Sequence, residues 1–314
     1  MNLYERYKGA LVGLAAGDAL GAPYEGKRPG SFEPSRKMTG GGVYEIEPGQ
    51  WTGNTSMALC LAASLLECRG FQPRDQLDCC LRWLRQGYLS SNGRAFGAGP
   101  TVLTALERYE SGGGPSVGDA QAAGNGSLAR LAPIPMYLLH DGARTKELAA
   151  RMSRTTHAAA EAVDACRYMA GLMTGALRGE SKEALLSDLY SPVYNYWLFQ
   201  RVALCPQIDA VARGVYKHKS APDLPAGEHA VDTLEAALWA FFKSDDFAAG
   251  ALLAVSLGND TATTAAVYGQ LAGAYYGYTA IPQPWRQKIA RRSEIEELAV
   301  ALLHETKQSI RHFT

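Results

Sequence analysis

Glycines spaced four residues apart inside apolar helical segments constrain the fold of this chain more than any other feature. The two sets are Gly9, Gly13 and Gly17, and Gly269, Gly273 and Gly277. A glycine inside a helix costs about 1 kcal/mol relative to alanine. Their repeated use therefore predicts helices that approach one another closely.

Apolar residues recur at helical spacing along most of the chain, and the alternation typical of strands is scarce. The predicted helices cover residues 5–20, 55–67, 73–87, 101–112, 128–139, 145–157, 160–177, 182–191, 230–244, 246–258 and 263–277. Pro73 opens the third of these and Gly87 closes it, which is the usual asymmetry of helix ends. No low-complexity linker or change of composition divides the sequence. We expect one all-α domain over residues 1–314.

The overall charge argues against two classes of partner. The formal net charge is +0, and 20% of the residues are charged. A neutral chain has no electrostatic grip on nucleic acid or on an anionic membrane surface. The longest apolar runs are far shorter than the roughly 20 residues of a bilayer helix, and no signal-peptide cleavage pattern is present. We expect a cytoplasmic protein with no nucleic-acid or membrane partner.

Four segments combine small polar residues with the start or end of an apolar helix. They are residues 15–26, 50–59, 124–134 and 258–267. Free N–H groups at a helix N-terminus bind phosphate and other anions, but the same pattern is typical of an ordinary N-cap. One such junction alone favours the cap. Four in one helical chain, two of them with acidic residues, favour a shared site.

Six segments, in this order, resemble the signatures of the ADP-ribosylglycohydrolase family, which includes the dinitrogenase reductase-activating glycohydrolases. The segments are GALVGLAAGDALGAPYEG, WTGNTSMALCLAASLLE, GNGSLARLAPIPMY, SRTTHAAAEAVDAC, VDTLEAALWAF and GNDTATTAAVYGQLAGAYYG. The resemblance extends from about residue 5 to about residue 290. It implies a compact domain of many helices with a central cleft.

The metal-binding motifs depart from the family pattern. Where the family usually has W-T-D-D-T and D-x-D-T, three aspartates are replaced by Gly53, Asn54 and Ala262. Hard divalent cations need several oxygen ligands, and two neighbouring dications need anionic neutralisation. Thr52, Asp260 and Thr263 remain as ligands in the resembled motifs. We therefore expect one weakly bound Mg²⁺ or Mn²⁺ or none, rather than a two-metal centre.

Glycosidic hydrolysis usually needs a carboxylate that activates water. The resemblance makes Glu25 and Asp260 the candidate catalytic residues, although Glu25 also fits a solvated loop carboxylate and Asp260 an N-cap. Asp18 is expected to order its loop or cap a helix. The candidate substrate-binding residues are Asn54, Phe96, Gly97, Gly99, Asn125, Gly126, Ser127, His157 and Tyr275.

Two basic residues in the resembled motifs have alternative roles. His157 fits a hydrogen-bonded core histidine better than a proton shuttle. For Arg130 a structural ion pair is favoured over contact with substrate.

Three functions fit these residues. The leading hypothesis is a hydrolase of an ADP-ribosyl or related ribosyl bond that does not depend on the usual two-metal centre. The alternatives are an inactive relative that binds ADP-ribose or a nucleotide, and an enzyme that acts on a small N-ribosyl metabolite. The expected partner is a small molecule containing ADP-ribose or another ribosyl group, or an ADP-ribosylated protein.

Overall fold

The chain is described by a computed structural model that covers residues 1–194, 196–199, 203–225 and 227–311. Within these residues the secondary structure is helical, with isolated bridges such as Asp119 to His157 but no strand. The prediction of an all-α fold is confirmed. The α-helices are α1 (Leu3–Gly21), α2 (Gly53–Glu67), α3 (Pro73–Gln86), α4 (Pro100–Glu110), α5 (Gly126–Ala129), α6 (Pro133–Tyr137), α7 (Gly142–Arg154), α8 (Ala160–Arg178), α9 (Lys182–Leu185), α10 (Tyr196–Phe199), α11 (Pro206–Ala212), α12 (Ala230–Lys243), α13 (Phe247–Ser256), α14 (Thr261–Tyr276), α15 (Gln283–Lys288) and α16 (Arg292–Arg311). Short 3₁₀ helices are η1 (Ala22–Tyr24), η2 (Gly42–Tyr44), η3 (Val215–His218), η4 (Ala221–Asp223) and η5 (Tyr278–Ala280).

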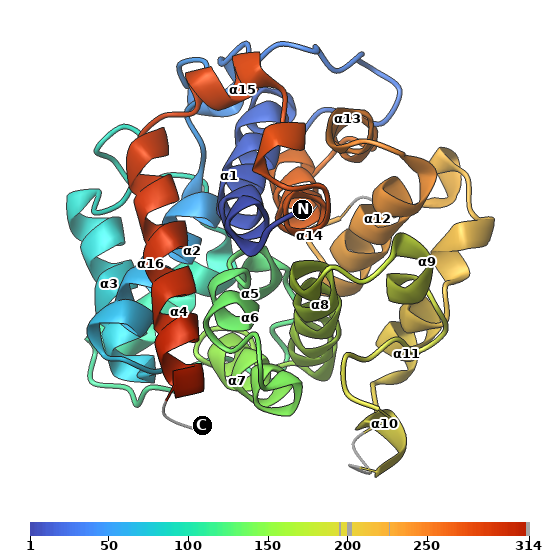
Figure 1. Ribbon diagram of the computed structural model, residues 1–314. Helices are drawn as coiled ribbons and strands as arrows, with labels where there is room; N and C mark the ends of the chain where they lie inside the picture. Colours follow the sequence, from blue (N-terminus) through green and yellow to red (C-terminus); the bar gives the residue numbers. More distant parts are fainter. Residues whose placement is uncertain (195, 200–202, 226, 312–314) are drawn as a thin grey trace.

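The glycine-bearing helices α1 and α14 pack against each other at the centre of the molecule (Figure 1). A Cβ atom added at Gly273 would lie 1.9 Å from the carbonyl oxygen of Gly9, and one at Gly9 would lie 2.1 Å from that of Gly273. Gly13 and Gly269 face each other in the same way. Only glycine permits backbones this close, so the predicted close approach is confirmed.

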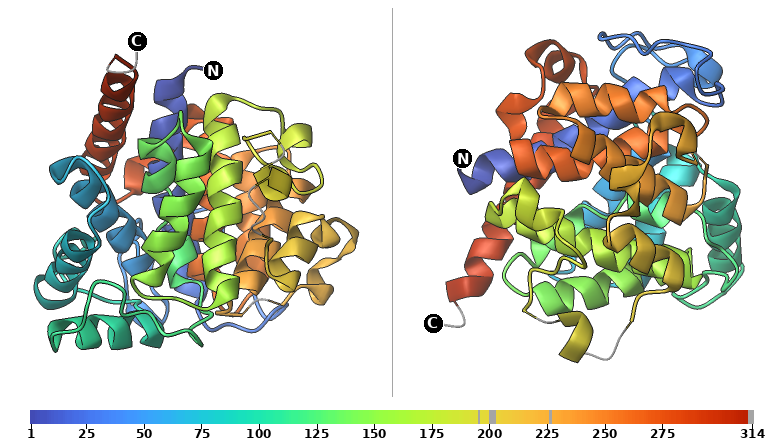
Figure 2. Two further views of the ribbon diagram at one scale, coloured as in Figure 1. Left: turned by 90° about the horizontal axis from the view of Figure 1, so that it is seen from below. Right: turned by 90° about the vertical axis from the view of Figure 1, so that its right-hand side faces the viewer.

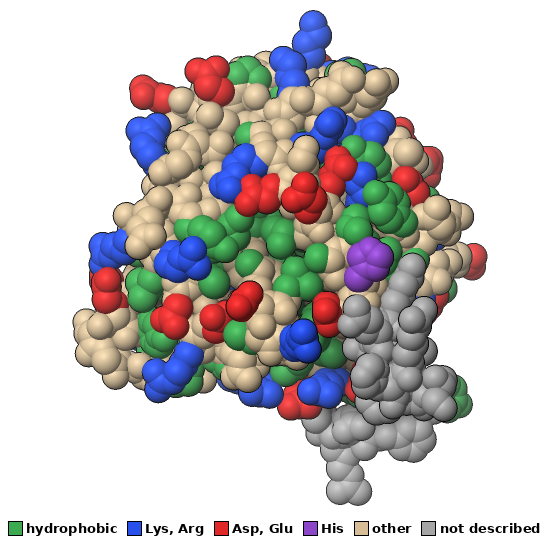
Figure 3. All heavy atoms as spheres, turned by 60° about the vertical axis from the view of Figure 1, so that its left-hand side comes forward, with side chains coloured by type: hydrophobic (Ala, Val, Ile, Leu, Met, Phe, Trp, Pro, Cys, Tyr) green, Lys and Arg blue, Asp and Glu red, His purple; other side chains and the backbone are tan. Residues whose placement is uncertain are grey.

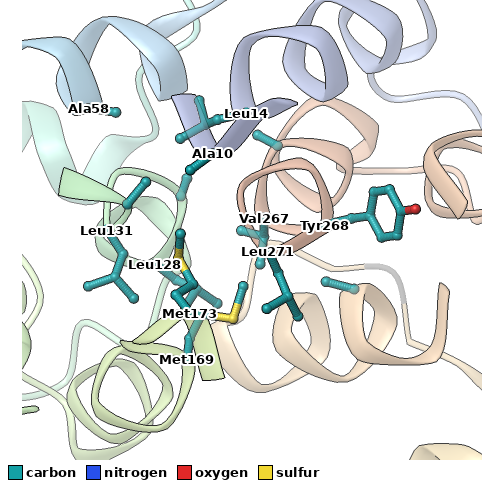
Figure 4. Packing of buried hydrophobic residues seen from close by; sticks show 14 of the residues in the cluster. Ala10, Leu14, Ala58, Leu128, Leu131, Met169, Met173, Val267, Tyr268 and Leu271 are labelled. Carbon is teal, nitrogen blue, oxygen red and sulfur yellow. The ribbon is translucent and has the colours of Figure 1, made fainter. Parts of the chain in front are cut away.

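Helices from the rest of the chain surround this central pair. Figure 2 shows α16 along one side of the molecule and α12 and α13 on the other. The core between them is apolar, as Figure 4 shows for Ala10 and Leu14 of α1 and Leu271 of α14 beside Met169 and Met173 of α8. All five side chains are buried. The core thus fixes the positions of the loops at the ends of α1 and α14.

Several helical segments differ from the prediction, and the short helices α10, α11 and α15 were not predicted. The single helix expected over 128–139 is two short helices, α5 and α6, because Pro133 has no N–H with which to continue the first and instead begins the second. The helix expected over 182–191 is only α9, and the chain beyond it turns at Leu189, whose φ is 50°. The long helix α16 was not predicted.

The surface agrees with the neutral composition. On the face shown in Figure 3, acidic and basic side chains are interspersed rather than gathered by sign. No described helix combines the length and the apolar character needed to cross a bilayer.

Candidate active site

The packing of α1 against α14 brings two sequence-distant carboxyl groups together. Glu25 follows η1 directly after α1, and Asp260 is the N-cap of α14. A Cβ atom at Gly21 would lie 2.3 Å from the carbonyl oxygen of Thr261, whose hydroxyl donates to the carbonyl oxygen of Gly21 at 2.8 Å. The end of α1 therefore lies against the start of α14, and Glu25 lies beside Asp260.

Each of the two carboxyl groups is held by other polar groups. Glu25 Oε2 accepts hydrogen bonds from the backbone N–H of Ala262 at 3.0 Å and from the hydroxyl of Thr261 at 3.2 Å. Asp260 Oδ2 accepts from the side-chain amide of Asn125 at 2.7 Å, and Oδ1 accepts from the N–H of Thr263 at 3.3 Å. Both carboxyl groups are therefore fixed in orientation.

Asp260 is buried, Glu25 is partly buried, and the two lie close enough for their charges to interact. Burial raises the pKa of Asp260, and burial together with the Asp260 charge raises the pKa of Glu25. Two adjacent buried carboxylates resist full ionisation, so the pair holds one proton and one negative charge near neutral pH.

The carboxyl pair lines a cavity of about 210 Å³. Ten of the predicted site residues line it: Glu25, Thr52, Asn54, Gly97, Gly99, Asn125, Gly126, His157, Asp260 and Thr263. This cavity corresponds to the cleft expected from the family resemblance. The sequence reasoning did not single out Tyr44 or Glu228, which also line it. Both lie in long loops, over residues 21–50 and 217–230, and loop length was the only signal that pointed to them.

Three predicted substrate-binding residues lie outside the lining. Ser127 is fully buried and its hydroxyl bonds with that of Ser153 at 2.9 Å. Tyr275 lies at the opposite end of α14 from Asp260, where its ring packs edge-on against Phe241. Phe96 packs against the lining residue Tyr44, with the two ring centroids 5.6 Å apart. The motif positions of these residues do not give them access to the cavity.

Asp18 is buried and anchors the N-terminus of α2, as expected of a capping residue. Its carboxylate accepts four hydrogen bonds, from the N–H and hydroxyl of Thr52 and from the N–H and hydroxyl of Thr55. Burial raises its pKa to about 6, and these four bonds oppose that rise. Asp18 thus fixes Thr52 at the cavity edge without lining the cavity itself.

The residues present do not fit a two-metal centre. A Cβ atom at Gly53 would lie 2.9 Å from two ring atoms of Trp83 and from the carbonyl oxygen of Gly97, so this position has no room for an aspartate. Ala262 packs in a small apolar cluster with Ala22 and Ile46. The described residues contain no group of three or more His, Cys, Asp or Glu side chains arranged to hold a metal.

Two of the polar groups that remain nearby already make hydrogen bonds. The Asn54 amide donates to Thr263 Oγ1 at 3.2 Å, and Thr52 Oγ1 donates to Asp18. A pair of carboxyl groups that holds one proton supplies a single negative charge, far short of what two dications need.

Arg130 differs from its prediction. It is fully buried, and no carboxylate pairs with it within the described part of the chain, so the expected ion pair is wrong. Its guanidinium donates instead to the hydroxyls of Thr155 at 3.3 Å and Thr156 at 2.6 Å. A hydroxyl satisfies the donor without neutralising the charge.

A second cavity, of about 420 Å³, adjoins the first. Four residues line both: Glu25, Tyr44, Glu228 and Asp260. The remaining lining residues of the second cavity are Gly26, Val43, Gly227 and Asn259, so its ionisable groups are three acids and one tyrosine. The carboxyl pair thus lies between a mixed polar cavity and an acidic one.

Comparison with known proteins agrees with this architecture. The model of the family described as ADP-ribosylglycohydrolase matches residues 1–311. An ADP-ribosylarginine hydrolase, Tri1 of Serratia proteamaculans (strain 568), is 37% identical over 307 residues, covering 96% of this chain and 79% of the relative. The ADP-ribosyl-[dinitrogen reductase] glycohydrolase of Rhodospirillum rubrum is 29% identical over 300 residues, covering 94% of each chain.

A solved structure has the same fold. A chain of an ADP-ribosylglycohydrolase-related protein complex superposes with a TM-score of 0.84 at 44% identity, covering 97% of this chain and 99% of that one. The whole-length match, the helical fold and the cavity at the ends of α1 and α14 lead to one conclusion. This chain belongs to the ADP-ribosylglycohydrolase family.

Proposed function

We propose that this chain hydrolyses the glycosidic bond between ADP-ribose and an arginine side chain, without a two-metal centre. The observation that carries the proposal is the pair of neighbouring carboxyl groups of Glu25 and Asp260, placed where a mixed polar cavity meets an acidic one. Family membership supports the ADP-ribosyl part, and the activity named for the Serratia relative supports arginine as the acceptor.

The carboxyl pair has the protonation state that such hydrolysis needs. The pair holds one proton and one negative charge, so it has a base for water and an acid for the leaving group within one unit. The oxygen of a water molecule bonds to C1 of the ribose as the bond from C1 to the acceptor nitrogen breaks. The electron pair of that bond passes to the nitrogen, which takes the proton of the protonated carboxyl, and the ionised carboxylate takes one proton of the water.

The acidic cavity favours a cationic acceptor. Glu228 and the ionised member of the pair supply negative charge, and Tyr44 supplies an aromatic ring at the junction. An arginine guanidinium is planar, permanently charged, and binds both carboxylates and aromatic faces. A hydroxyl-linked or neutral acceptor gains neither interaction.

The proposed independence of two metals rests on three observations. The position of Gly53 is closed by Trp83, Ala262 is packed among apolar side chains, and the Asn54 amide donates where a metal ligand has to offer a lone pair. With its nitrogen bonded to Thr263, Asn54 has only a neutral carbonyl oxygen left for a cation and supplies no negative charge. In place of two metal ions, the carboxyl pair stabilises the positive charge that develops on the ribose in the transition state.

The test is release of ADP-ribose from ADP-ribosylarginine, measured with excess Mg²⁺ and with excess chelator. We expect equal turnover in both, and a loss of at least about 100-fold in Glu25→Gln. Glu33→Gln is the matched control, because Glu33 lies in the same loop but is exposed and lines neither cavity. Turnover only with Mg²⁺ refutes metal independence, and no turnover in either buffer refutes the hydrolase.

A second function is favoured by the same substitutions. Three carboxylates of the family's catalytic unit are missing at Gly53, Asn54 and Ala262. Removing one member of such a unit often costs as much activity as removing all of them. The chain would then bind ADP-ribose without cleaving it. Calorimetric binding of ADP-ribose, together with no turnover of the arginine conjugate, would select this function over the hydrolase.

A further inference from the structure

Arg130 carries a buried positive charge that pairs with no carboxylate among the described residues, and its contacts lead to the cavity. Its Nη2 donates to Thr156 Oγ1 at 2.6 Å. Thr156 Oγ1 in turn lies 2.7 Å from His157 Nδ1. His157 lines the cavity beside the carboxyl pair. These three residues form a chain of hydrogen bonds from the core to the site.

The hydroxyl hydrogen of Thr156 determines the direction of the hydrogen bonds along this chain. A guanidinium only donates, so Thr156 Oγ1 accepts from Arg130. The hydroxyl hydrogen of Thr156 then needs an acceptor, and the described residues offer it only His157 Nδ1. Since Nδ1 accepts, a neutral imidazole carries its hydrogen on Nε2.

His157 is neutral near physiological pH. Burial and the charge of Arg130 lower its pKa to about 3. Protonation would place a hydrogen on Nδ1 facing the Thr156 hydroxyl, which already points its own hydrogen there.

The Nε2 edge of the ring opens toward the cavity through two glycines. A Cβ atom at Gly124 would lie 3.3 Å from Nε2, and one at Gly126 would lie 3.4 Å from it. Both glycines line the cavity, and no described residue accepts a hydrogen bond from Nε2. The ring therefore has an unused donor beside two lining positions that have no side chain.

We propose that Arg130 is a positioning residue that acts through Thr156 to hold His157 as a neutral Nε2–H donor to an oxygen of the bound ligand. The arrangement explains why an uncompensated guanidinium is kept in the core. It assigns His157 the role of a fixed donor and leaves proton transfer to the carboxyl pair. Only the identity of the ligand rests on the proposed function.

The tautomer is measured directly by long-range ¹H–¹⁵N NMR of the histidine rings, with His157 assigned by its loss in His157→Gln. We expect the wild-type ring to show an unprotonated Nδ1 and a protonated Nε2, unchanged between pH 8 and pH 5. A ring protonated on Nδ1, or one that titrates in this range, overturns the proposal without any variant of Arg130 or Thr156.

A matched set of variants tests the role of the hydroxyl. Thr156→Val removes it and is expected to give a mixture of tautomers, whereas Thr156→Ser keeps it and the wild-type tautomer. Thr155→Val is the control, because Thr155 also accepts from Arg130 but does not contact His157. A pure Nε2–H tautomer in Thr156→Val overturns the proposal.

Calorimetry with ADP-ribose tests the donor. Loss of one hydrogen bond predicts about three- to tenfold weaker binding in Thr156→Val and unchanged binding in Thr156→Ser. Gly124→Ala is expected to weaken binding while leaving the tautomer unchanged, because it covers Nε2. If Thr156→Val binds ADP-ribose as tightly as wild type, the proposed hydrogen bond from His157 Nε2 to the ligand is overturned. If wild type binds no ADP-ribose, the proposed function fails, while the NMR result still decides the tautomer.

Discussion

Adding a single methyl group at Gly53 tests whether the lost metal motif is structurally closed. A Cβ atom there would lie 2.9 Å from Trp83 Cη2 and Cζ2, whereas carbon atoms pack at about 3.5–4.0 Å. Trp83 is fully buried. Such overpacking costs about 1–3 kcal/mol, and the helix preference of alanine returns at most about 1 kcal/mol. We expect Gly53→Ala to lower the free energy of unfolding by about 1–2 kcal/mol.

The assay is urea denaturation of a double-mutant cycle with Trp83→Phe. The smaller ring lacks the crowding atoms, and Trp83 Nε1 makes no hydrogen bond that the change would remove. The two substitutions should therefore couple favourably by about 1 kcal/mol. Gly70→Ala is the control, because the nearest atom to its added Cβ is 4.0 Å away. Additive effects, or a neutral Gly53→Ala, would refute the reasoning. Any attempt to restore the metal motif would then need no change at Trp83.

Three further results are expected. Gly273→Ala should lower the free energy of unfolding by about 3 kcal/mol or more in urea, since its Cβ would meet the backbone of Gly9 at 1.9 Å; an unchanged midpoint would contradict the packing of α1 on α14. Burial and the Arg167 charge lower the pKa of Lys146 to about 7. The unfolded chain then binds more protons than the folded one above pH 7, so wild-type stability relative to Lys146→Met should rise toward pH 10 by up to about 1.4 kcal/mol per pH unit; a flat difference would contradict this. Excess Mg²⁺ and excess chelator should give melting temperatures within about 1 °C of each other, and a rise of several degrees with Mg²⁺ would show that an ion binds.

Features of the fold that depend on local residue type were predictable. The glycines of α1 and α14 predicted close packing because glycine inside a helix needs a reason, and Pro73 and Gly87 marked the ends of α3. Pro133 indicates a helix break, but the apolar periodicity on both sides of it predicts one continuous helix. The helix α16 follows the last family motif, so only its own apolar periodicity indicates it.

The site was predictable where it comes from helix ends and not where it depends on tertiary contacts. Glu25, Asn125 and Asp260 belong to loop-to-helix motifs that also line the cavity. Glu228 reaches the cavity through a loop whose path depends on packing elsewhere. The isolation of Arg130 was equally hidden, because a sequence shows that a charge exists but not whether a carboxylate lies within reach.

The packing of α1 on α14 also sets the order of events during synthesis. The chain leaves the ribosome from its N-terminus, so α1 emerges first and its glycine face stays uncovered until α14 has followed. Contacts between residues this far apart along the chain form slowly. Because Glu25 and Asp260 lie at the ends of these two helices, the carboxyl pair forms only when the fold closes. A chain interrupted before α14 therefore has an exposed apolar helix, which chaperones and proteases recognise. Such a chain contains Glu25 but lacks the partner carboxyl group of Asp260.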